Sequence, residues 1–193
     1  MLHTILALIS FSFVSSITPG PNNLMLMTSG ANFGFRRTGP HMLGVAIGFA
    51  VMVALVGFGV AQVFIAHPAA RRILAALSVI YMFWLAWKIT QASAPSKRQV
   101  AKPMTFLQAA AFQWVNPKAW AMAVTAVTVY AALGPLAVGL VFGLVTIPCV
   151  AVWAALGLGV ARWLSDPLRL KIFNYSMAAM LILSLAPVLE LAK

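Results

Sequence analysis

The stretch Thr18-Pro19-Gly20-Pro21-Asn22-Asn23 interrupts an apolar run that extends from about residue 2 to residue 29. Its prolines lack a backbone N–H and its glycine loosens the chain, so carbonyls one turn earlier lose their helical partners. Within a membrane, such backbone is tolerated only against protein or beside a water-filled cavity. The stretch therefore predicts either a binding site built on a broken helix or a simple proline kink filled by a neighbouring helix.

Apolar runs of similar length recur along the whole chain. Of its 193 residues, 63% are hydrophobic and 8% are charged, which is too little charge to cover a soluble domain. The runs approach the roughly 20 residues that cross about 30 Å of hydrocarbon. We therefore expect an all-α integral membrane protein, multi-pass, with six transmembrane helices in a single domain over residues 1–193. The first run lacks a basic segment and a cleavage site, and we expect it to be retained.

The six expected spans cover about residues 2–29, 42–65, 73–87, 104–130, 136–161 and 172–191. Proline breaks the first span of each half, at Pro19 and at Pro117 within Gln113-Trp114-Val115-Asn116-Pro117-Lys118. The next span in each half opens with a Gly-xxx-Gly pair, Gly44/Gly48 and Gly139/Gly143, and closes with Gly-x-Gly-Val-Ala. These pairs predict close helix packing, within the bundle or between subunits.

The shared order of features predicts two repeats, at about residues 1–92 and 104–193, joined by a linker at about 93–103. Three spans per half force the repeats into opposite orientations, as in secondary transporters whose site lies between paired broken helices. We therefore expect the two breaks to meet near the bilayer midplane. The candidate substrate-binding residues are Thr18, Pro19, Gly20, Pro21, Asn22, Asn23, Gln113, Asn116, Pro117 and Lys118.

Two features of these breaks suit a ligand that bears a carboxylate. The side chains of Asn22 and Asn23 lie beside the amides of a new half-helix N-terminus, where anions are stabilised. Lys118 lies far from any obvious end of its span, where a charge is costly unless it faces protein or water. Lys118 therefore either pairs with a substrate carboxylate or snorkels to the headgroups.

The charge pattern indicates topology and not nucleic-acid binding. Thirteen Lys and Arg against two acids give a net charge of +11, but the basic residues lie between apolar runs, as in cytoplasmic loops. Nine follow the first, third and fifth spans and three lie on the other side. We therefore place both termini outside and the linker in the cytoplasm.

His41 is expected in a loop, and the single Cys149 excludes a disulfide or thiol pair. We expect no metal site and no cofactor.

The motifs Ile17-Thr18-Pro19-Gly20-Pro21-Asn22-Asn23, Gly34-Phe35-Arg36-Arg37 and Asn116-Pro117-Lys118 resemble the LysE/RhtB-type amino-acid exporter family, over essentially the whole chain. Trp84-Leu85-Ala86-Trp87-Lys88 and Lys102-Pro103 resemble the branch that exports cysteine and O-acetylserine. The resemblance implies a homodimeric carrier of the bacterial inner membrane that exports amino acids or close derivatives, using the proton gradient. Some relatives carry an acidic residue in the fifth span, where this chain has Pro148 and Cys149. That departure argues against a coupling scheme built on a buried carboxylate.

Two other classes remain to be weighed, a membrane channel and an embedded enzyme. A channel would show a ring of acidic or repeated pore-loop residues. An enzyme would need a nucleophile and base, or a metal cluster, within the membrane. The sequence offers none of these patterns, so the exporter is preferred over both.

The topology can be tested with single cysteines at the two ends of the charge asymmetry. Lys97→Cys and Lys193→Cys should react with a membrane-impermeant thiol reagent from opposite sides, because the linker is expected inside and the C-terminus outside. Reaction of both from the outside would overturn the six-span arrangement with external termini.

Overall fold

The computed structural model describes residues 1–91, 102–161 and 163–183, and these residues form helices joined by short turns, without a strand among them. The all-α prediction is confirmed for this part of the chain. The helices are α1 (Leu2–Ile17), α2 (Pro21–Phe33), α3 (Phe35–Leu55), α4 (Ala61–Ala66), α5 (Pro68–Thr90), α6 (Phe106–Phe112), α7 (Pro117–Val129), α8 (Pro135–Ala161) and α9 (Pro167–Leu183).

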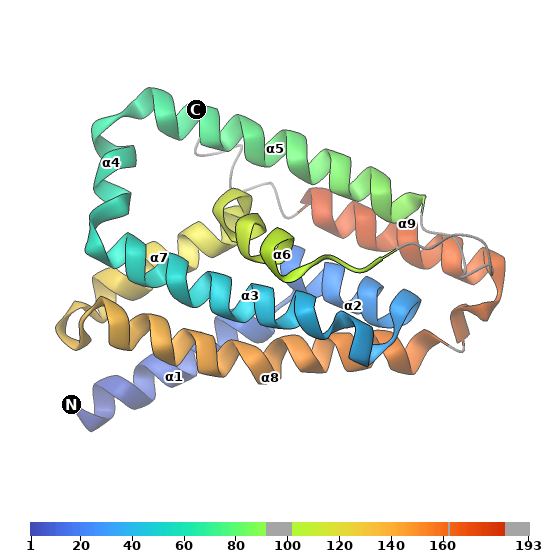
Figure 1. Cartoon of the computed structure of the whole chain (residues 1–193), viewed down its shortest axis with the longest axis horizontal. Coiled ribbons are helices and arrows are strands. Elements are labelled where there is room, and N and C mark those ends of the chain that lie inside the picture. The colour runs from blue at the N-terminus through green and yellow to red at the C-terminus, as the bar shows by residue number, and fades with distance from the viewer. Residues whose placement is uncertain (92–101, 162, 184–193) are drawn as a thin grey trace.

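Helix α8 is the element around which helices α1, α2 and α3 pack. It runs along one side of the molecule and contacts α1, α2 and α3 (Figure 1). Helices α5 and α9 pair on the opposite side, and the short α6 lies between them and α3. The short α4 turns the chain from the end of α3 to the start of α5. The two halves of the sequence are therefore interleaved and do not form separate bodies.

Proline sets the start of many of these helices. Helices α2, α5 and α7 each begin with proline at the first helical positions, where its missing N–H would be unpaired anyway and its fixed φ suits the helix. Helix α6 starts differently, with a capping box in which Thr105 and Gln108 exchange backbone and side-chain hydrogen bonds. The breaks in the sequence are thus also the starting points of new helices.

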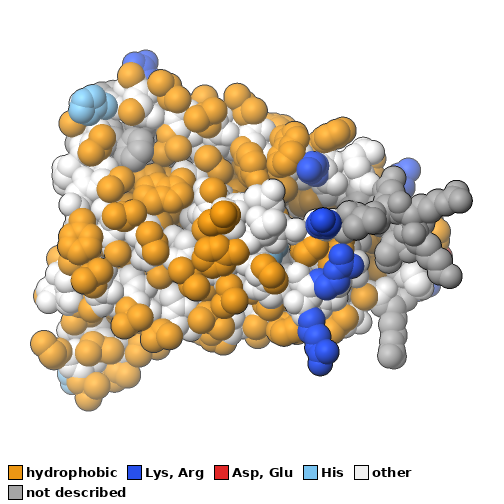
Figure 2. Space-filling view, in the orientation of Figure 1, with side chains coloured by type: hydrophobic (Ala, Val, Ile, Leu, Met, Phe, Trp, Pro, Cys, Tyr) orange, Lys and Arg blue, Asp and Glu red, His pale blue; other side chains and the backbone are white. Residues whose placement is uncertain are grey.

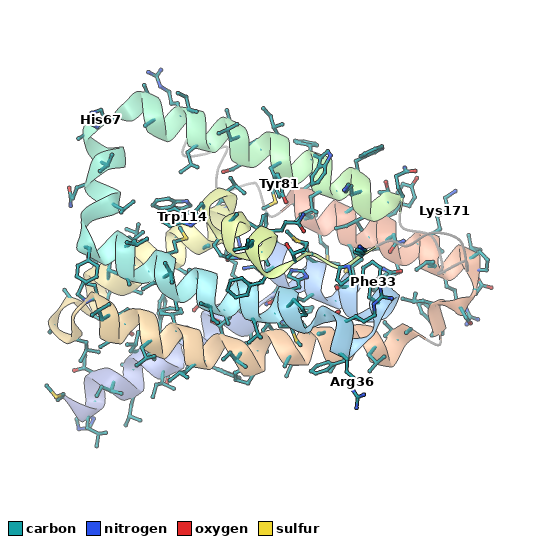
Figure 3. The ribbon with its side chains drawn as sticks, in the orientation of Figure 1. Phe33, Arg36, His67, Tyr81, Trp114 and Lys171 are labelled. Carbon is teal, nitrogen blue, oxygen red and sulfur yellow. The ribbon has the colours of Figure 1, made fainter. Side chains whose placement is uncertain are left out.

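The surface is apolar, as expected of a membrane protein. Leu136, Leu140 and Leu144 follow one another on α8 and are 67%, 64% and 61% exposed, and Figure 2 shows hydrophobic side chains over most of the visible face. The Lys and Arg that are visible in Figure 2 gather mainly at one end of the molecule, with some blue also at the other end. Arg36 and Lys171 lie at the end where most of these side chains gather, and His67 lies at the other (Figure 3).

The described helices account for fewer than six spans. Three are long and apolar enough to cross a membrane, at Phe35–Val63, Arg72–Thr90 and Pro135–Ala161, and the α1–α2 pair, bent by 57°, would make a fourth. Helices α6 and α7 are short pieces on either side of the second break. The expected linker at 93–103 and the end of the last expected span fall largely outside the described residues.

The second expected span, at 42–65, needs correction at both ends. Helix α3 already begins at Phe35, because Gly34, with φ of 80°, turns the chain sharply after α2. Pro40 is accommodated near the start of the helix, so His41 is not a loop residue but a helical side chain only 1% exposed. At the other end Gly59, with φ of 112°, breaks the helix before α4. The expected span is therefore one helix and a bend.

Glycines lie where helices approach most closely. A Cβ added at Gly157 of α8 would collide with the carbonyl of Met27 on α2, and one at Gly30 of α2 would collide with the carbonyl of Ala154. The predicted packing pairs also face neighbours within the chain. Gly44 and Gly48 lie against α6, and Gly139 and Gly143 lie against α3. Such backbone contact replaces the hydrophobic effect, which cannot hold helices together in lipid.

The α2–α8 contact can be tested with one added methyl group. We expect Gly157→Ala to destabilise the fold by about 1–3 kcal/mol through overpacking, measured as the free energy of unfolding in mixed detergent micelles. Gly159→Ala is the matched control, because it gains the same helix propensity on the same helix with nothing within 4 Å of the added atom. Equal stability of the two variants would contradict the packing described here.

Candidate functional site

The first break leaves a run of backbone carbonyls without helical partners. The chain leaves the helix at Thr18, with ψ of 146°, and α2 starts three residues later. Side chains satisfy these carbonyls one by one. The Thr18 hydroxyl donates to Ser15 O at 2.9 Å, Asn23 Nδ2 donates to Ser16 O at 2.7 Å and to Thr18 O at 2.8 Å, and Trp153 Nε1 donates to Ile17 O at 2.9 Å. Each carbonyl from Ser15 to Thr18 therefore accepts a hydrogen bond from a side chain.

The second break is built by a similar use of polar side chains. Helix α6 tightens into a 3₁₀ turn over Gln113–Val115, and Asn116 then caps α7 by accepting a hydrogen bond from the backbone N–H of Lys118 at 3.2 Å. Trp120 Nε1 donates back to Trp114 O at 2.9 Å. The side chains of Gln113 and Asn116 are buried, 0% and 1% exposed. The turn is therefore held on both sides by polar groups inside the bundle.

The two breaks contact each other through side chains. Asn22 and Gln113 form a reciprocal amide pair, with Nδ2 to Oε1 at 2.8 Å and Nε2 to Oδ1 at 3.1 Å. Lys118 reaches across to the first break, where its ammonium donates to Thr18 O at 2.8 Å, Thr18 Oγ1 at 2.8 Å and Pro19 O at 3.3 Å. The breaks therefore meet, as their positions in the sequence predict. Their depth in a bilayer and their role in binding stay predictions.

A small cavity opens where the breaks meet. It has about 370 Å³ of space not occupied by atoms, part of it open to the outside. Its polar lining comes from both breaks and from α1 and α8, and its apolar lining comes from α3, α7 and α8. The polar residues are Ser15, Ser16, Asn22, Asn23, Asn116, Lys118 and Thr146, with Gly20 beside them, and the apolar ones are Val45, Phe49, Ala119, Met122 and Val150.

The candidate residues divide into four roles in this arrangement. Asn22, Asn116 and Lys118 line the cavity, as does Gly20, and remain candidates for contact with a ligand. Asn23 also lines it, but its amide is engaged by the carbonyls of Ser16 and Thr18, so it braces the break. Lys118 donates hydrogen bonds to Thr18 and Pro19, and Asn22 pairs with Gln113, so these three residues hold lining residues in place. The two new helices start at Pro21 and Pro117.

Sequence reasoning missed three polar residues of the cavity, Ser15, Ser16 and Thr146. The hydroxyls of Ser16 and Thr146 lie 3.2 Å apart and link α1 to α8. The Ser-Ser pair directly before the first break was a usable signal, because hydroxyls in an apolar run need partners. Thr146 has no such signal, since its place depends on how α8 crosses α1.

The acidic residues offer no partner for Lys118 within the described part of the chain. Asp166 is exposed at the start of α9, where the backbone N–H groups of Arg169 and Leu168 hydrogen-bond its carboxylate and lower its pKa. Glu190 lies outside the described residues. The described residues also hold no cluster of His, Cys, Asp or Glu that would bind a metal ion. Among the residues that the structure describes, the Lys118 ammonium donates only to neutral oxygens.

An apolar all-helical chain with a polar cavity between two broken helices has the form of a membrane transport protein. The chain belongs to the family described as LysE type translocator, whose model matches residues 13–190. This family consists of transporters and not enzymes, as the sequence predicts.

Curated relatives agree with that family. The chain is 33% identical over 126 residues to the cysteine/O-acetylserine efflux proteins of Escherichia coli (strain K12) and Shigella flexneri, and 32% identical to that of Escherichia coli O1:K1 / APEC. Each match covers 63% of this chain and 62% of the relative. No solved structure matches the chain significantly.

Proposed function

We propose that this protein exports small neutral amino acids or close derivatives, such as cysteine and O-acetylserine, from the bacterial cytoplasm. The observation that carries the proposal is the meeting of the two breaks, which gathers amide, hydroxyl and ammonium groups around one cavity. Membership of a translocator family and relatives named for cysteine and O-acetylserine efflux support the same reading.

The substrate carboxylate is assigned to Lys118 and to the start of α2. Proline at the first position of α2 has no backbone N–H. The backbone N–H groups of Asn22 and Asn23 are among the first-turn donors that a helix leaves without internal partners. The positive end of the helix dipole favours an anion at this place. Lys118 adds a full positive charge beside it, so a carboxylate would gain charge-assisted hydrogen bonds.

The remaining parts of the proposal concern architecture and energy. We propose six spans arranged as two inverted repeats, at about 1–92 and 104–193, with both termini outside and a cytoplasmic linker. The gathering of basic side chains at one end of the molecule supports this orientation. We further propose an inner-membrane homodimer driven by the proton gradient, as the family resemblance implies. The exposed apolar face of α8 is consistent with lipid or a second copy.

The test is the loss of export when the Lys118 ammonium is removed. Lys118→Ala should reach normal levels in the membrane, because a lysine in the hydrocarbon costs about 2.5–3.5 kcal/mol on insertion scales. It should lose tenfold or more of export, since a charge-assisted hydrogen bond contributes about 1.5–3 kcal/mol. The assay is efflux from cells loaded with amino acid, normalised to protein in the membrane.

The matched control for this variant is Lys171→Ala, which removes the same charge from an exposed position on α9. It should export like the wild type. Lys118→Arg should be impaired, because the planar guanidinium does not fit the three oxygens that an ammonium contacts. Wild-type export by Lys118→Ala would reduce Lys118 to a structural lysine and remove it from the site.

A further inference from the structure

We propose that the Thr18 and Pro19 oxygens that hold the Lys118 ammonium in this structure are the binding site for the α-ammonium group of the substrate. In this scheme a zwitterionic amino acid displaces Lys118 from these oxygens, and Lys118 turns to the substrate's carboxylate. The inference rests on the proposed export function and adds to it a defined ammonium site and a defined competitor.

The three oxygens match the shape of an alkylammonium group. Lys118 Nζ lies 2.8 Å from Thr18 O, 2.8 Å from Thr18 Oγ1 and 3.3 Å from Pro19 O. An ammonium has three donors and no acceptor, so each donor has one oxygen. The ε-ammonium of lysine and the α-ammonium of an amino acid are the same chemical group. Oxygens that hold one of them are therefore suited to hold the other.

The break fixes these oxygens as acceptors. The hydroxyl of Thr18 donates its hydrogen to Ser15 O at 2.9 Å, so Oγ1 can only accept a hydrogen bond from the ammonium. The carbonyls of Thr18 and Pro19 are free for side chains because the chain is extended at Thr18 and the next helix begins only at Pro21. Asn23 also donates to Thr18 O at 2.8 Å and holds that carbonyl in place when Lys118 leaves.

The exchange keeps every charged group paired only if the ligand carries both charges. A zwitterion gives its ammonium to the oxygens and its carboxylate to Lys118. A ligand with a carboxylate alone draws Lys118 away and leaves Thr18 Oγ1 and Pro19 O without a donor. A ligand with an ammonium alone must expel Lys118 and offers it no acceptor. A polar group left unpaired away from water costs affinity, so both partial ligands are disfavoured.

The surroundings allow Lys118 to move. Its stem lies against the backbone of Gly20, where an added Cβ would come within 2.7 Å of Lys118 Cδ and 3.2 Å of Nζ. Lys118 and Gly20 both border the cavity. Rotation of the flexible lysine stem therefore carries the ammonium from the oxygens into the cavity, without movement of α7.

Three related thiols separate the two charges. Cysteine carries both, N-acetylcysteine carries only the carboxylate, and cysteamine carries only the ammonium. Binding of each labelled compound to the purified full chain in detergent, with reductant present, should follow the scheme. For the wild type we expect N-acetylcysteine and cysteamine to bind tenfold or more weaker than cysteine, as the loss of one charged partner predicts.

The decisive variant removes the competitor and leaves the oxygens in place. Lys118→Met should lose affinity for cysteine but bind cysteamine about tenfold or more tightly than the wild type does. Adding Thr18→Val to Lys118→Met should reverse that gain, since it removes one of the three oxygens. Lys171→Met is the matched control and should keep the wild-type order of affinities.

Each outcome decides between the two proposals. Equal binding of cysteamine by the wild type and Lys118→Met, or N-acetylcysteine binding to the wild type as tightly as cysteine, would overturn the ammonium site. If Lys118→Met does not fold, the order of the three thiols on the wild type decides alone. Absence of amino-acid counterflow in proteoliposomes of the wild type would instead defeat the export proposal. Counterflow of cysteine and N-acetylcysteine at equal rates would defeat the ammonium site alone.

Discussion

The structure depends on one constraint, that backbone groups freed from a helix within a membrane must find partners inside the protein. The sequence around the first proline break frees several carbonyls at once, and each one from Ser15 to Pro19 accepts a hydrogen bond from a side chain. The donors come from the break itself, from α8 and from α7: Thr18, Asn23, Trp153 and Lys118. Satisfying the break therefore also fixes which helices surround it.

This requirement joins the fold to the site. Because Trp153 is needed at Ile17 O, α8 must lie beside the break, and the glycines of α2 and α8 allow that approach. Because Lys118 donates to the oxygens of Thr18 and Pro19, the second break lies opposite the first. The Asn22–Gln113 pair adds a second link between them. The cavity is therefore bordered by side chains that also donate hydrogen bonds to the free backbone carbonyls of the first break.

Much of this arrangement was predictable from the residue types. Prolines, asparagines and a lysine within apolar runs signal broken helices and a polar site, since each is costly in lipid unless it serves a purpose. The partner of Lys118 was not predictable in the same way. We expected Lys118 to pair with a substrate carboxylate or to snorkel to the headgroups, whereas in the structure it donates to neutral oxygens of the other break. Local sequence patterns do not show which residues from distant parts of the chain will come into contact, and Thr146 was missed for the same reason.

The ends of the second expected span could not be predicted from the local sequence either. Gly34, Gly39 and Pro40 resemble a loop, but Gly34 makes the turn and Pro40 lies inside the helix. Sequence reasoning therefore did not predict that His41 lies in the buried part of α3. The repeated Gly-x-Gly-Val-Ala segments likewise behave differently. Gly59 has positive φ and bends the chain, while Gly159 continues a regular helix. Equal motifs in the two halves need not have equal conformations.

The claim that the two breaks form one site is tested most directly by cross-linking within the native membrane. Cysteines would replace Asn22 and Gln113 in a Cys149→Ser background, with a protease site inserted in the segment 93–100 so that cleavage separates the two halves. A short bifunctional thiol reagent should keep the cleaved halves joined, and each single-cysteine chain should not. Complete separation of the halves, with both cysteines shown to be reactive, would contradict a shared site.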